Sequence, residues 1–477
     1  MTDLQVPVWL GDQALTTSTS RALTGADGSV VARVSVAGRL VQQQMAQRAA
    51  RAAPALREID ERTWFDLFAR AGARVRRELA DGRHDRELDA LSAATGLPRL
   101  RVERGVAAVA DHLGHLDSIM AAQSPDGSLS AYRDGRCGRP WRWLPAGSTC
   151  MVRVPANFPT IMIEWLQVLA ARRPTLVNTS DQDPFVAGMF VAALYAEGLP
   201  PGAVSVCHGD APTWLRLADQ VVWPGEDAPP ELSPARLKTY HFGRSKTVLP
   251  GGAPAPGTWD RLARLAFQGS GRLCTNMSAL AVLGDRAEAA AAARRLAEAF
   301  AAYPVLPLAD PAARVPAFPQ RRLADDLVRL LRREIAAGAV DATAATSLGR
   351  DLLVEFDGMV FLRPTVLLVE PGSALFGMEL PFPCTVVAPV ARERVAAACS
   401  PSLIVSVVGD DPELVEHLLA EPGITKVFTG GHVDRAYEPV DPQEGYLADF
   451  LFQKKALHTG ARHPEEAQCR RPPDSGR

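Results

Sequence analysis

The sequence predicts an α/β protein with two lobes, each built around a parallel sheet, plus a small bridging β element. Three observations predict this class. Apolar strands alternate with amphipathic helices over residues 150–223, and again over 259–428. A breaker cluster, "LPGGAPAPG" at 249–257, separates the two series and predicts a hinge. The chain has 477 residues, more than the roughly 100–200 of one ordinary domain.

The first 125 residues are predicted to be mostly helical cover. Apolar positions recur there at helical spacing between arginines and glutamates, over 39–56, 61–79 and 87–113. From about residue 133 the pattern becomes alternating and aromatic, as in "RPWRWLP". This change predicts strands or a ribbon that lead into a new unit.

The first alternation predicts a parallel sheet, because strands separated by helices are joined by crossover connections. Its strands are predicted at 150–154, 175–178, 203–207 and 220–223, and its helices at 160–171, 184–197 and around Trp214. Ligands bind beyond the carboxyl ends of such strands. The turns expected at that edge are 155–159, 178–184 and 223–227.

The second alternation predicts a second α/β lobe. Its helices are predicted at 259–267, 286–302, 322–337 and 412–420, and its strands at 279–283, within 352–369, and at 385–388, 403–408 and 425–428. The segment 461–477 is polar and contains prolines, so we expect it to be disordered.

Composition excludes several classes of protein. Lys and Arg number 52 and Asp and Glu 54, so no basic field exists to hold nucleic acid. The longest apolar stretch, 185–196, is far shorter than the ~20 residues that span a bilayer, so no membrane insertion is expected. Seven scattered cysteines without metal-ligand spacing predict no metal site and a reducing, cytoplasmic setting. Phosphate-loop, G-x-G-x-x-G, H-E-x-x-H and G-x-S-x-G motifs are missing.

Two residues carry the chemistry that the pattern suggests. Cys274 follows a glycine-bearing turn in "GSGRLCTNMS" and precedes a strand, which could place its thiol at the mouth between the lobes. A lone cysteine is more often a buried small hydrophobe. Asn157 lies in "PANFP" at the end of the first strand of the sheet, where its amide could donate to an oxyanion. A plain Asn-Phe-Pro turn is the structural alternative.

Three stretches in order resemble the aldehyde dehydrogenase superfamily, namely "PANFP" (155–159), "GSGRLC" (269–274) and "MELPFP" (378–383). They are similar to its Asn-Phe-Pro turn, its Gly-Gln-x-Cys turn and its Glu-x-Phe-Gly-Pro stretch. Further segments follow the same order over nearly the whole chain, including "TGADGSVVARV" and "AEGLPPGAVSVCHGD". Within the superfamily, "EGYLADFLFQKKA", "ADQVVWPGEDA" and "ELPFP" most resemble the long-chain acyl-CoA reductases.

The resemblance implies an aldehyde-dehydrogenase-like fold and a role for each matching position. Cys274 matches the nucleophile, and Asn157 with the Cys274 N–H matches the oxyanion hole. Glu379 matches the glutamate on the nicotinamide ribose, and Gly225 matches the glycine near the pyrophosphate at a helix start. The remaining expected cofactor contacts are Pro155, Asn178, Ser180 and Asp181.

The resemblance also implies the domains. Residues 1–127 and 147–250 are expected to bind the cofactor, and 251–433 to carry the cysteine. Segments 128–146 and 434–460 are expected to form the bridging and oligomerisation element of a dimer or tetramer.

Departures from the superfamily pattern suggest the reaction. Where aldehyde-oxidising members have a water-activating glutamate, "VLPGGAP" places Leu249 or Pro250. Loss of a general base slows water attack by about 10²–10⁴-fold. The leading hypothesis is therefore an NAD(P)H-dependent reductase that takes an acyl group from coenzyme A or a carrier protein onto Cys274 and releases an aldehyde. The alternatives are a hydrolytic NAD(P)-dependent aldehyde dehydrogenase and a catalytically silent scaffold.

Cofactor choice and proton transfer stay open at the level of sequence. Asp181 could bond a free 2′-hydroxyl, whereas a basic side chain could hold the 2′-phosphate of NADPH, which the family favours. The basic candidates are Arg172, Arg173, Arg244 and Lys246. Arg272 would lower the thiol pKa if it faced the sulfur. His208 and His241 are possible proton donors, although a lone histidine is more often structural.

Overall fold

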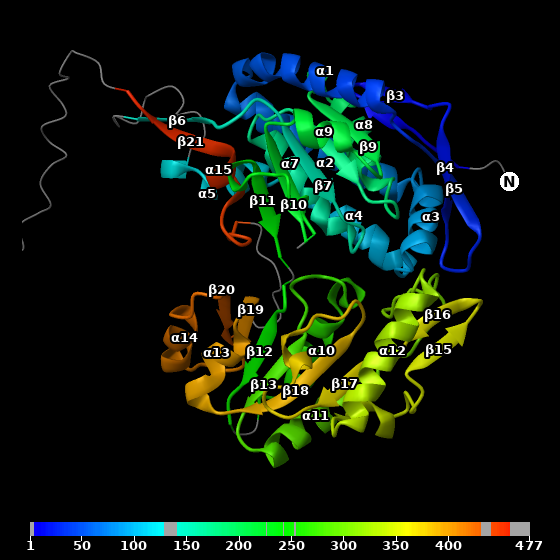
Figure 1. The fold of residues 1–477 in the computed structure, drawn as a ribbon, viewed down its shortest axis with the longest axis vertical. Helices are drawn as coiled ribbons and strands as arrows, with labels where there is room; N and C mark the ends of the chain where they lie inside the picture. The colour runs from blue at the N-terminus through cyan, green and yellow to red at the C-terminus, as the bar shows by residue number, and fades with distance from the viewer. Residues whose placement is uncertain are drawn as a thin grey trace, which may run out of the picture.

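The computed structural model describes residues 4–127, 141–225, 227–241, 243–251, 254–430 and 440–457. These residues form two lobes, one above the other in Figure 1, and each lobe is centred on a seven-stranded sheet. The predicted α/β class with two parallel-sheet lobes is confirmed. No helix in the described part of the chain is long and apolar enough to cross a membrane.

The sheet of the first lobe has the order β11-β10-β7-β8-β9-β2-β3. Its first five strands run parallel, whereas β2 and β3 are antiparallel additions at one edge. The strands are β2 (Val8–Leu10), β3 (Gln13–Leu15), β7 (Cys150–Val154), β8 (Thr175–Thr179), β9 (Val204–His208), β10 (Gln220–Pro224) and β11 (Leu237–Tyr240).

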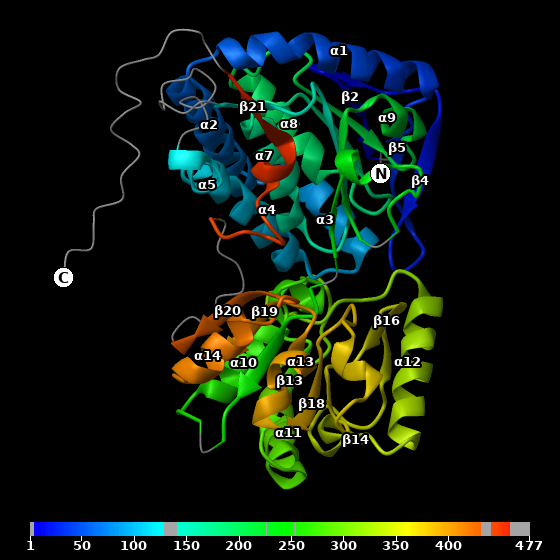
Figure 2. The same cartoon turned by 60° about the vertical axis from the view of Figure 1, so that its left-hand side comes forward.

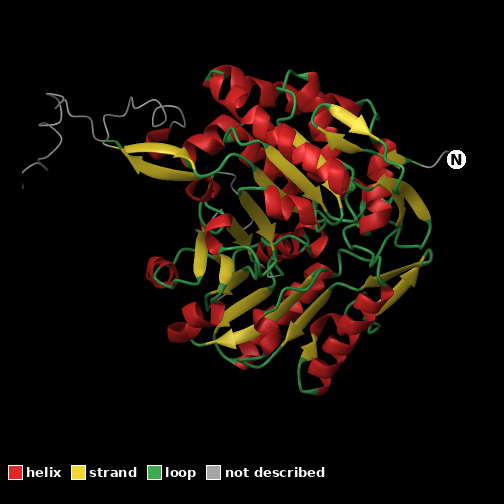
Figure 3. Cartoon of the chain, turned by 45° about the horizontal axis from the view of Figure 1, so that its top comes forward, coloured by secondary structure: helices red, strands yellow, loops and turns green. Residues whose placement is uncertain are grey.

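Helices cover both faces of this sheet (Figure 3). Neighbouring side chains in one strand enter different cores: Met151 packs with α1 and α9, while Val152 packs with α2, α7 and α8. This double burial explains why the central parallel strands are rich in apolar residues and why the polar residues within them, such as Asn178 and Ser205, are buried. The helices are α1 (Arg39–Glu58), α2 (Glu61–Ala80), α3 (Asp85–Thr95), α4 (Arg99–Leu113), α5 (Leu116–Ala122), α7 (Ile163–Ala170), α8 (Val186–Ala196) and α9 (Pro212–Leu217).

The sheet of the second lobe has the order β14-β17-β18-β13-β12-β19-β20 and is parallel except for β14. Its strands are β12 (Lys246–Leu249), β13 (Ala279–Leu283), β14 (Val340–Asp341), β17 (Thr365–Leu368), β18 (Cys384–Val390), β19 (Ser402–Val407) and β20 (Ile424–Thr429). The helices of this lobe are α10 (Thr258–Ala266), α11 (Arg286–Phe300), α12 (Arg321–Ala336), α13 (Val395–Cys399) and α14 (Pro412–Leu419). A hairpin of β15 (Leu353–Phe356) and β16 (Met359–Leu362) packs against α12.

Three expectations about the elements need correction. Residues 5–35 form strands rather than helical cover, namely β1 (Gln5–Val6), β2, β3, β4 (Ser20–Thr24) and β5 (Val30–Ser35). The helix predicted at 87–113 is two helices, because Gly96 takes φ 72° and Pro98 follows it. The strand β12 pairs with β13 and β19, so the second lobe begins before residue 250. The chain passes from one sheet to the other between the end of β11 at Tyr240 and the start of β12 at Lys246, and the cluster 249–257 begins at the last residue of β12.

A two-stranded antiparallel ribbon stands apart from both sheets (Figures 1 and 2). It pairs β6 (Trp141–Pro145) with β21 (Phe452–Ala456), which follows the short helix α15 (Leu447–Leu451). The rings of Trp143 and Phe452 stack 4.4 Å apart. This ribbon lies within the predicted bridging element, and its part in oligomerisation remains a prediction. Segments 128–140, 431–439 and 458–477 lie outside the described residues.

Candidate active site

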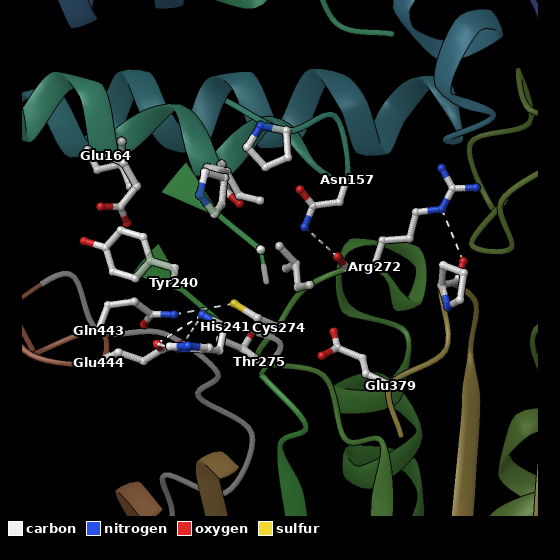
Figure 4. A pocket seen from close by; sticks show the side chains of 18 of the residues that line it. Asn157, Glu164, Tyr240, His241, Arg272, Cys274, Thr275, Glu379, Gln443 and Glu444 are labelled. Atoms are coloured by element: carbon white, nitrogen blue, oxygen red, sulfur yellow. Dashed lines mark hydrogen bonds and ion pairs between the residues drawn. The ribbon is translucent and has the colours of Figure 1, made fainter. Parts of the chain in front are cut away.

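A cavity of about 1040 Å³ lies where the two lobes meet. Its walls come from the carboxyl ends of β7 and β10, the start of α7, the turn that carries Cys274, and the segments around Glu379 and Gln443 (Figure 4). The edge of the first sheet that was predicted to bind a ligand therefore faces the predicted nucleophile.

A run of left-handed backbone presents Cys274 to this cavity. Gly269, Ser270 and Gly271 have φ of 49°, 59° and 77° between α10 and the cysteine. Gly271 admits no side chain, because a Cβ there would lie 2.4 Å from the backbone carbon of Phe382. Cys274 as a whole residue is half-buried and lines the cavity, and Gln443 Nε2 donates a hydrogen bond to its Sγ at 3.5 Å. The sulfur is thus reachable from the cavity.

The surroundings of Cys274 favour the neutral thiol. Burial raises its pKa to about 12, and the carboxylates of Glu379, Glu164 and Glu444 add to the rise, while Lys426 opposes it. In Figure 4, Glu164 and Glu444 lie on one side of the sulfur and Glu379 on the other. Because the thiolate is the reactive form, the site needs a group that accepts the thiol proton.

Arg272 is not that activating group. Its guanidinium turns away from the sulfur and donates to the carbonyls of Pro381, Thr95 and Ala317 at 3.3, 2.5 and 2.8 Å. Burial lowers its own pKa to about 10. The residue therefore anchors the cysteine turn between the lobes, and the idea that it lowers the thiol pKa is wrong.

Asn157 lies on the opposite wall and holds the cysteine turn directly. Its Nδ2 donates to the backbone carbonyl of Arg272 at 3.0 Å, and its Oδ1 is buried without a hydrogen-bond partner among the described residues. An amide nitrogen carries two hydrogens, so one remains for an oxyanion. The placement suits the predicted role beside Cys274.

Three of the predicted cofactor contacts line the cavity: Pro155, Gly225 and Glu379. Glu379 accepts a hydrogen bond from the Arg244 N–H at 3.1 Å, and burial raises its pKa. Gly225 takes φ 102°, but no helix begins there. The described residues that follow it contain only a short 3-10 turn, Pro234–Arg236, before β11. The predicted pyrophosphate site at a helix start is therefore wrong in that detail.

The other three predicted contacts do not line the cavity. Asn178 is buried, and both ends of its amide are bonded, to Arg153 and to the Gly209 carbonyl, each at 2.7 Å. Ser180 accepts from the N–H groups of the turn that follows it. Asp181 is exposed and forms an ion pair with Arg21 at 2.8 Å.

The proposed phosphate-binding cations are also placed elsewhere. Arg172 and Arg173 precede β8, so they lie at its amino end, and each donates to backbone carbonyls. Lys246 is buried, and its Nζ donates to three carbonyls and to the hydroxyl of Ser402. None of these three lines the cavity, and neither does the fourth candidate, Arg244, whose backbone N–H donates to Glu379. The hydrogen bonds of Arg172, Arg173 and Lys246 offset the cost of burying their charges.

His208 is structural rather than a proton donor at the site. It is buried behind the first sheet, where its Nδ1 lies 2.8 Å from Thr179 Oγ1 and its Nε2 lies 2.9 Å from the Pro7 carbonyl. Burial lowers its pKa to about 4. His241, in contrast, lines the cavity.

The burial of His208 predicts acid sensitivity. The unfolded chain binds a proton near the ordinary histidine pKa of about 6.5, whereas the folded chain resists it down to about 4. Above a pH of about 6.5 the buried ring carries no proton in either state, and its contribution to the free energy of unfolding is fully present. As the pH falls from about 6.5 to about 4, only the unfolded chain takes up the proton, and the free energy of unfolding decreases by about 3 kcal/mol at most. Urea unfolding at pH 7 and pH 4.5 will show a smaller loss of stability in His208→Gln than in the wild type. Equal losses in both proteins would contradict this assignment.

Sequence reasoning missed several polar residues of the cavity, among them Arg153, Glu164, Gln443 and Glu444. Glu164 has its pKa raised to about 7 by burial, and it hydrogen-bonds Tyr240. Glu164 did give a signal, since it is the one carboxylate in the apolar run 161–171. Gln443 and Glu444 reach the site only because the chain returns there after β20.

The cavity has groups that suit a nicotinamide cofactor. The carboxylate of Glu379 can accept hydrogen bonds from ribose hydroxyls, and Gly225 lies at the wall after β10. The predicted polar contacts Asn178, Ser180 and Asp181 are not among its lining residues.

Comparison with known proteins identifies the fold. No family model matches the chain. Aldehyde dehydrogenase X of Bos taurus is 40% identical over 75 residues, which are 15% of this chain and 14% of that protein. A probable methylmalonate-semialdehyde/malonate-semialdehyde dehydrogenase [acylating] of Drosophila melanogaster is 27% identical over 156 residues, 30% of each chain. The matches thus span 14% and 30% of these curated relatives.

Similarity to solved structures extends over almost the whole chain. Aldehyde dehydrogenase 21 of Physcomitrella patens, solved with succinate, has a TM-score of 0.75 at 14% identity and covers 96% of this chain and 98% of its own. An NADP-dependent enzyme of E. coli has a TM-score of 0.76 at 14% identity, covering 95% and 98%. An indole-3-acetaldehyde dehydrogenase of P. syringae, solved with NAD+, has a TM-score of 0.75 at 16% identity, covering 95% and 96%.

Proposed function

Because the chain has the fold of the aldehyde dehydrogenases, we propose that it is an NAD(P)-dependent oxidoreductase that acts on aldehydes through an acyl-cysteine at Cys274. The observation that carries the proposal is the position of that thiol. It is reachable within the cavity between the lobes, and Asn157 lies on the facing wall. This is the arrangement that a thiol nucleophile and an oxyanion donor require.

Each residue has a defined task in this reaction. Cys274 adds to the substrate carbonyl, and the free hydrogen of Asn157 Nδ2 stabilises the negative charge that forms on the carbonyl oxygen. A nicotinamide dinucleotide, held in this cavity, would supply the acceptor or donor of the hydride. Glu379 would hold the adjoining ribose, since its carboxylate lines the same cavity.

Hydrolysis of the acyl-enzyme by water is the first candidate for the closing step. Three carboxylates, Glu164, Glu379 and Glu444, act electrostatically on the sulfur, and a water near it has acceptors for its proton. The name of the Bos taurus relative, aldehyde dehydrogenase X, agrees with this candidate. The product would be a carboxylic acid.

Exchange with a thiol, such as coenzyme A or a carrier-protein arm, is the second candidate. Leu249, at the position that the resemblance gives to the water-activating glutamate, is buried in an apolar core and does not line the cavity. The Drosophila relative carries the word acylating in its name. In the reverse direction this enzyme would reduce an acyl thioester to an aldehyde, as the resemblance to acyl-CoA reductases implies.

A single assay separates the two candidates. The purified protein is given short and long aliphatic aldehydes with NAD+ or NADP+, with and without coenzyme A, and both cofactor reduction and products are measured. We expect cofactor reduction with free acid as the product without added thiol. Acyl-CoA that forms only when coenzyme A is present would support the second candidate. Absence of cofactor reduction with every aldehyde, and of oxidation with acyl thioesters, would refute the proposed function.

A further inference from the structure

An imidazole and a carboxylate form a pair at the edge of the cavity. Nδ1 of His241 lies 2.9 Å from Oε2 of Glu444, and the backbone N–H of His241 donates to both carboxylate oxygens at 3.0 and 3.1 Å. A carboxylate can only accept, so Nδ1 carries the hydrogen and Nε2 is left with a lone pair. Nε2 has no hydrogen-bond partner among the residues that the structure describes.

Residues close to Glu444 and His241 in the sequence contact the nucleophile Cys274. Gln443, next to Glu444, donates to Cys274 Sγ at 3.5 Å. Gly243, two residues after His241, packs on the Cys274 backbone so closely that a Cβ there would lie 1.6 Å from its carbonyl oxygen. Both His241 and Cys274 line the cavity, and Figure 4 shows the link from His241 to Glu444.

The backbone of Glu444 is held in an unfavourable conformation for this contact. Its φ is 52°, in the left-handed region that non-glycine residues rarely occupy, and Lys238 Nζ binds its carbonyl oxygen. Strain of this kind costs roughly 1–3 kcal/mol and persists where the surrounding structure imposes it, most often at functional sites. The surrounding contacts therefore hold the Glu444 backbone in this conformation and fix the position of its carboxylate.

The other carboxylates near the sulfur are less suited to accept its proton. Glu379 receives a backbone N–H and has been matched to the cofactor. Glu164 is engaged by Tyr240. A neutral imidazole with a free nitrogen, oriented by an acid, is the arrangement that activates thiols and hydroxyls in hydrolases of unrelated folds.

We propose that His241 is the general base that removes the proton of Cys274, and that Glu444 positions its ring. Among the described residues no hydrogen bond joins Nε2 to Sγ, so the proton passes through one bridging water. The Sγ–H bond breaks, the proton reaches Nε2 along this relay, and the sulfur electron pair forms the bond to the substrate carbonyl carbon as its π electrons move to oxygen. The proton later returns to the sulfur when the acyl group leaves. This inference rests on the proposed nucleophilic role of Cys274.

Several charged groups face the two reacting side chains and enter any pH profile. Those near the sulfur are Glu164 on α7, Glu379, Glu444 and Lys426 on β20. Those near the imidazole are Glu444 and, on β11, Lys238 and Tyr240. The test must therefore isolate His241 by substitution.

Alkylation of Cys274 by iodoacetamide tests the proposal in the free enzyme, without cofactor or substrate. The rate is followed from pH 5.5 to 10 by mass spectrometry of the Cys274 peptide. In the wild type we expect the rate to reach a plateau well before the thiol itself would ionise. His241→Asn should lower the rate at neutral pH by about 10²-fold and remove the plateau. Glu444→Gln should lower it by about tenfold, and the double variant should be no slower than His241→Asn.

Matched controls make the outcome decisive. His417→Asn, on the exposed side of α14, should alkylate like the wild type. Circular dichroism and thermal melts show whether each variant is folded. A rate for folded His241→Asn within about threefold of the wild type at every pH, or a larger loss in Glu164→Gln, would overturn the assignment. Failure of the proposed function is separate, because it would appear as absent hydride transfer in a wild type that still shows His241-dependent alkylation.

Discussion

Replacing Cys274 with alanine will abolish NAD(P)-dependent turnover of aldehydes, with a loss on the order of 10³–10⁶-fold. The reason is that hydride transfer from the substrate requires the covalent thiohemiacetal, and none of the other cysteines in the described residues lines the cavity. Turnover is measured by cofactor absorbance under saturating aldehyde, with cofactor binding followed separately by fluorescence.

Cys384→Ala is the matched control for that experiment. Its sulfur is buried at the start of β18 within the core of the second lobe, so its removal should leave turnover close to the wild-type value in folded protein. If Cys274→Ala retained activity while Cys384→Ala lost it, the nucleophile would have been assigned to the wrong cysteine.

Asn157→Ala will lower kcat by about 10²–10³-fold, the usual cost of removing one oxyanion donor. The same substitution should leave the iodoacetamide rate of Cys274 within about threefold, because alkylation at an sp³ carbon develops no oxyanion. This contrast separates a catalytic amide from one that merely holds the turn through the Arg272 carbonyl. Parallel losses in both assays would show that Asn157 acts only by positioning the turn.

The sequence was a good guide to most of the strands that are buried on both faces. β7, β8, β9 and β13 are rich in apolar residues between turns, and they were located within a residue or two. β12 is equally buried but was missed, because its four residues "KTVL" run directly into the proline- and glycine-rich cluster that begins at Leu249. The strands β1 to β5 were missed, because they have two to six residues each and only part of each is buried. β11 was missed for a similar reason, since its four residues are only half-buried.

Motif order located the centre of the site but not its surroundings. Cys274, Asn157 and Glu379 lie within short local patterns and were found from them. Glu164 belongs to no such pattern, and Glu444 begins the stretch "EGYLADFLFQKKA" but was given no role in the site. Tertiary structure brings the two to the sulfur from positions 280 residues apart. The contacts to the adenosine half of the cofactor were predicted in part from Asn178. Its amide instead forms hydrogen bonds within the first lobe, to Arg153 and to the Gly209 carbonyl. The position of a residue at the end of a strand does not show whether its polar atoms are free to bind a ligand or already bonded within the protein.

The glycine at 243 has a mechanical consequence. It lies in the segment that joins the two sheets, and it presses against the carbonyl of the nucleophile with no side chain between them. Any side chain at position 243 would force this carbonyl away, because a Cβ would lie 1.6 Å from its oxygen. The direction in which the thiol faces the cavity therefore depends on one missing methyl group in a segment far from it in the sequence.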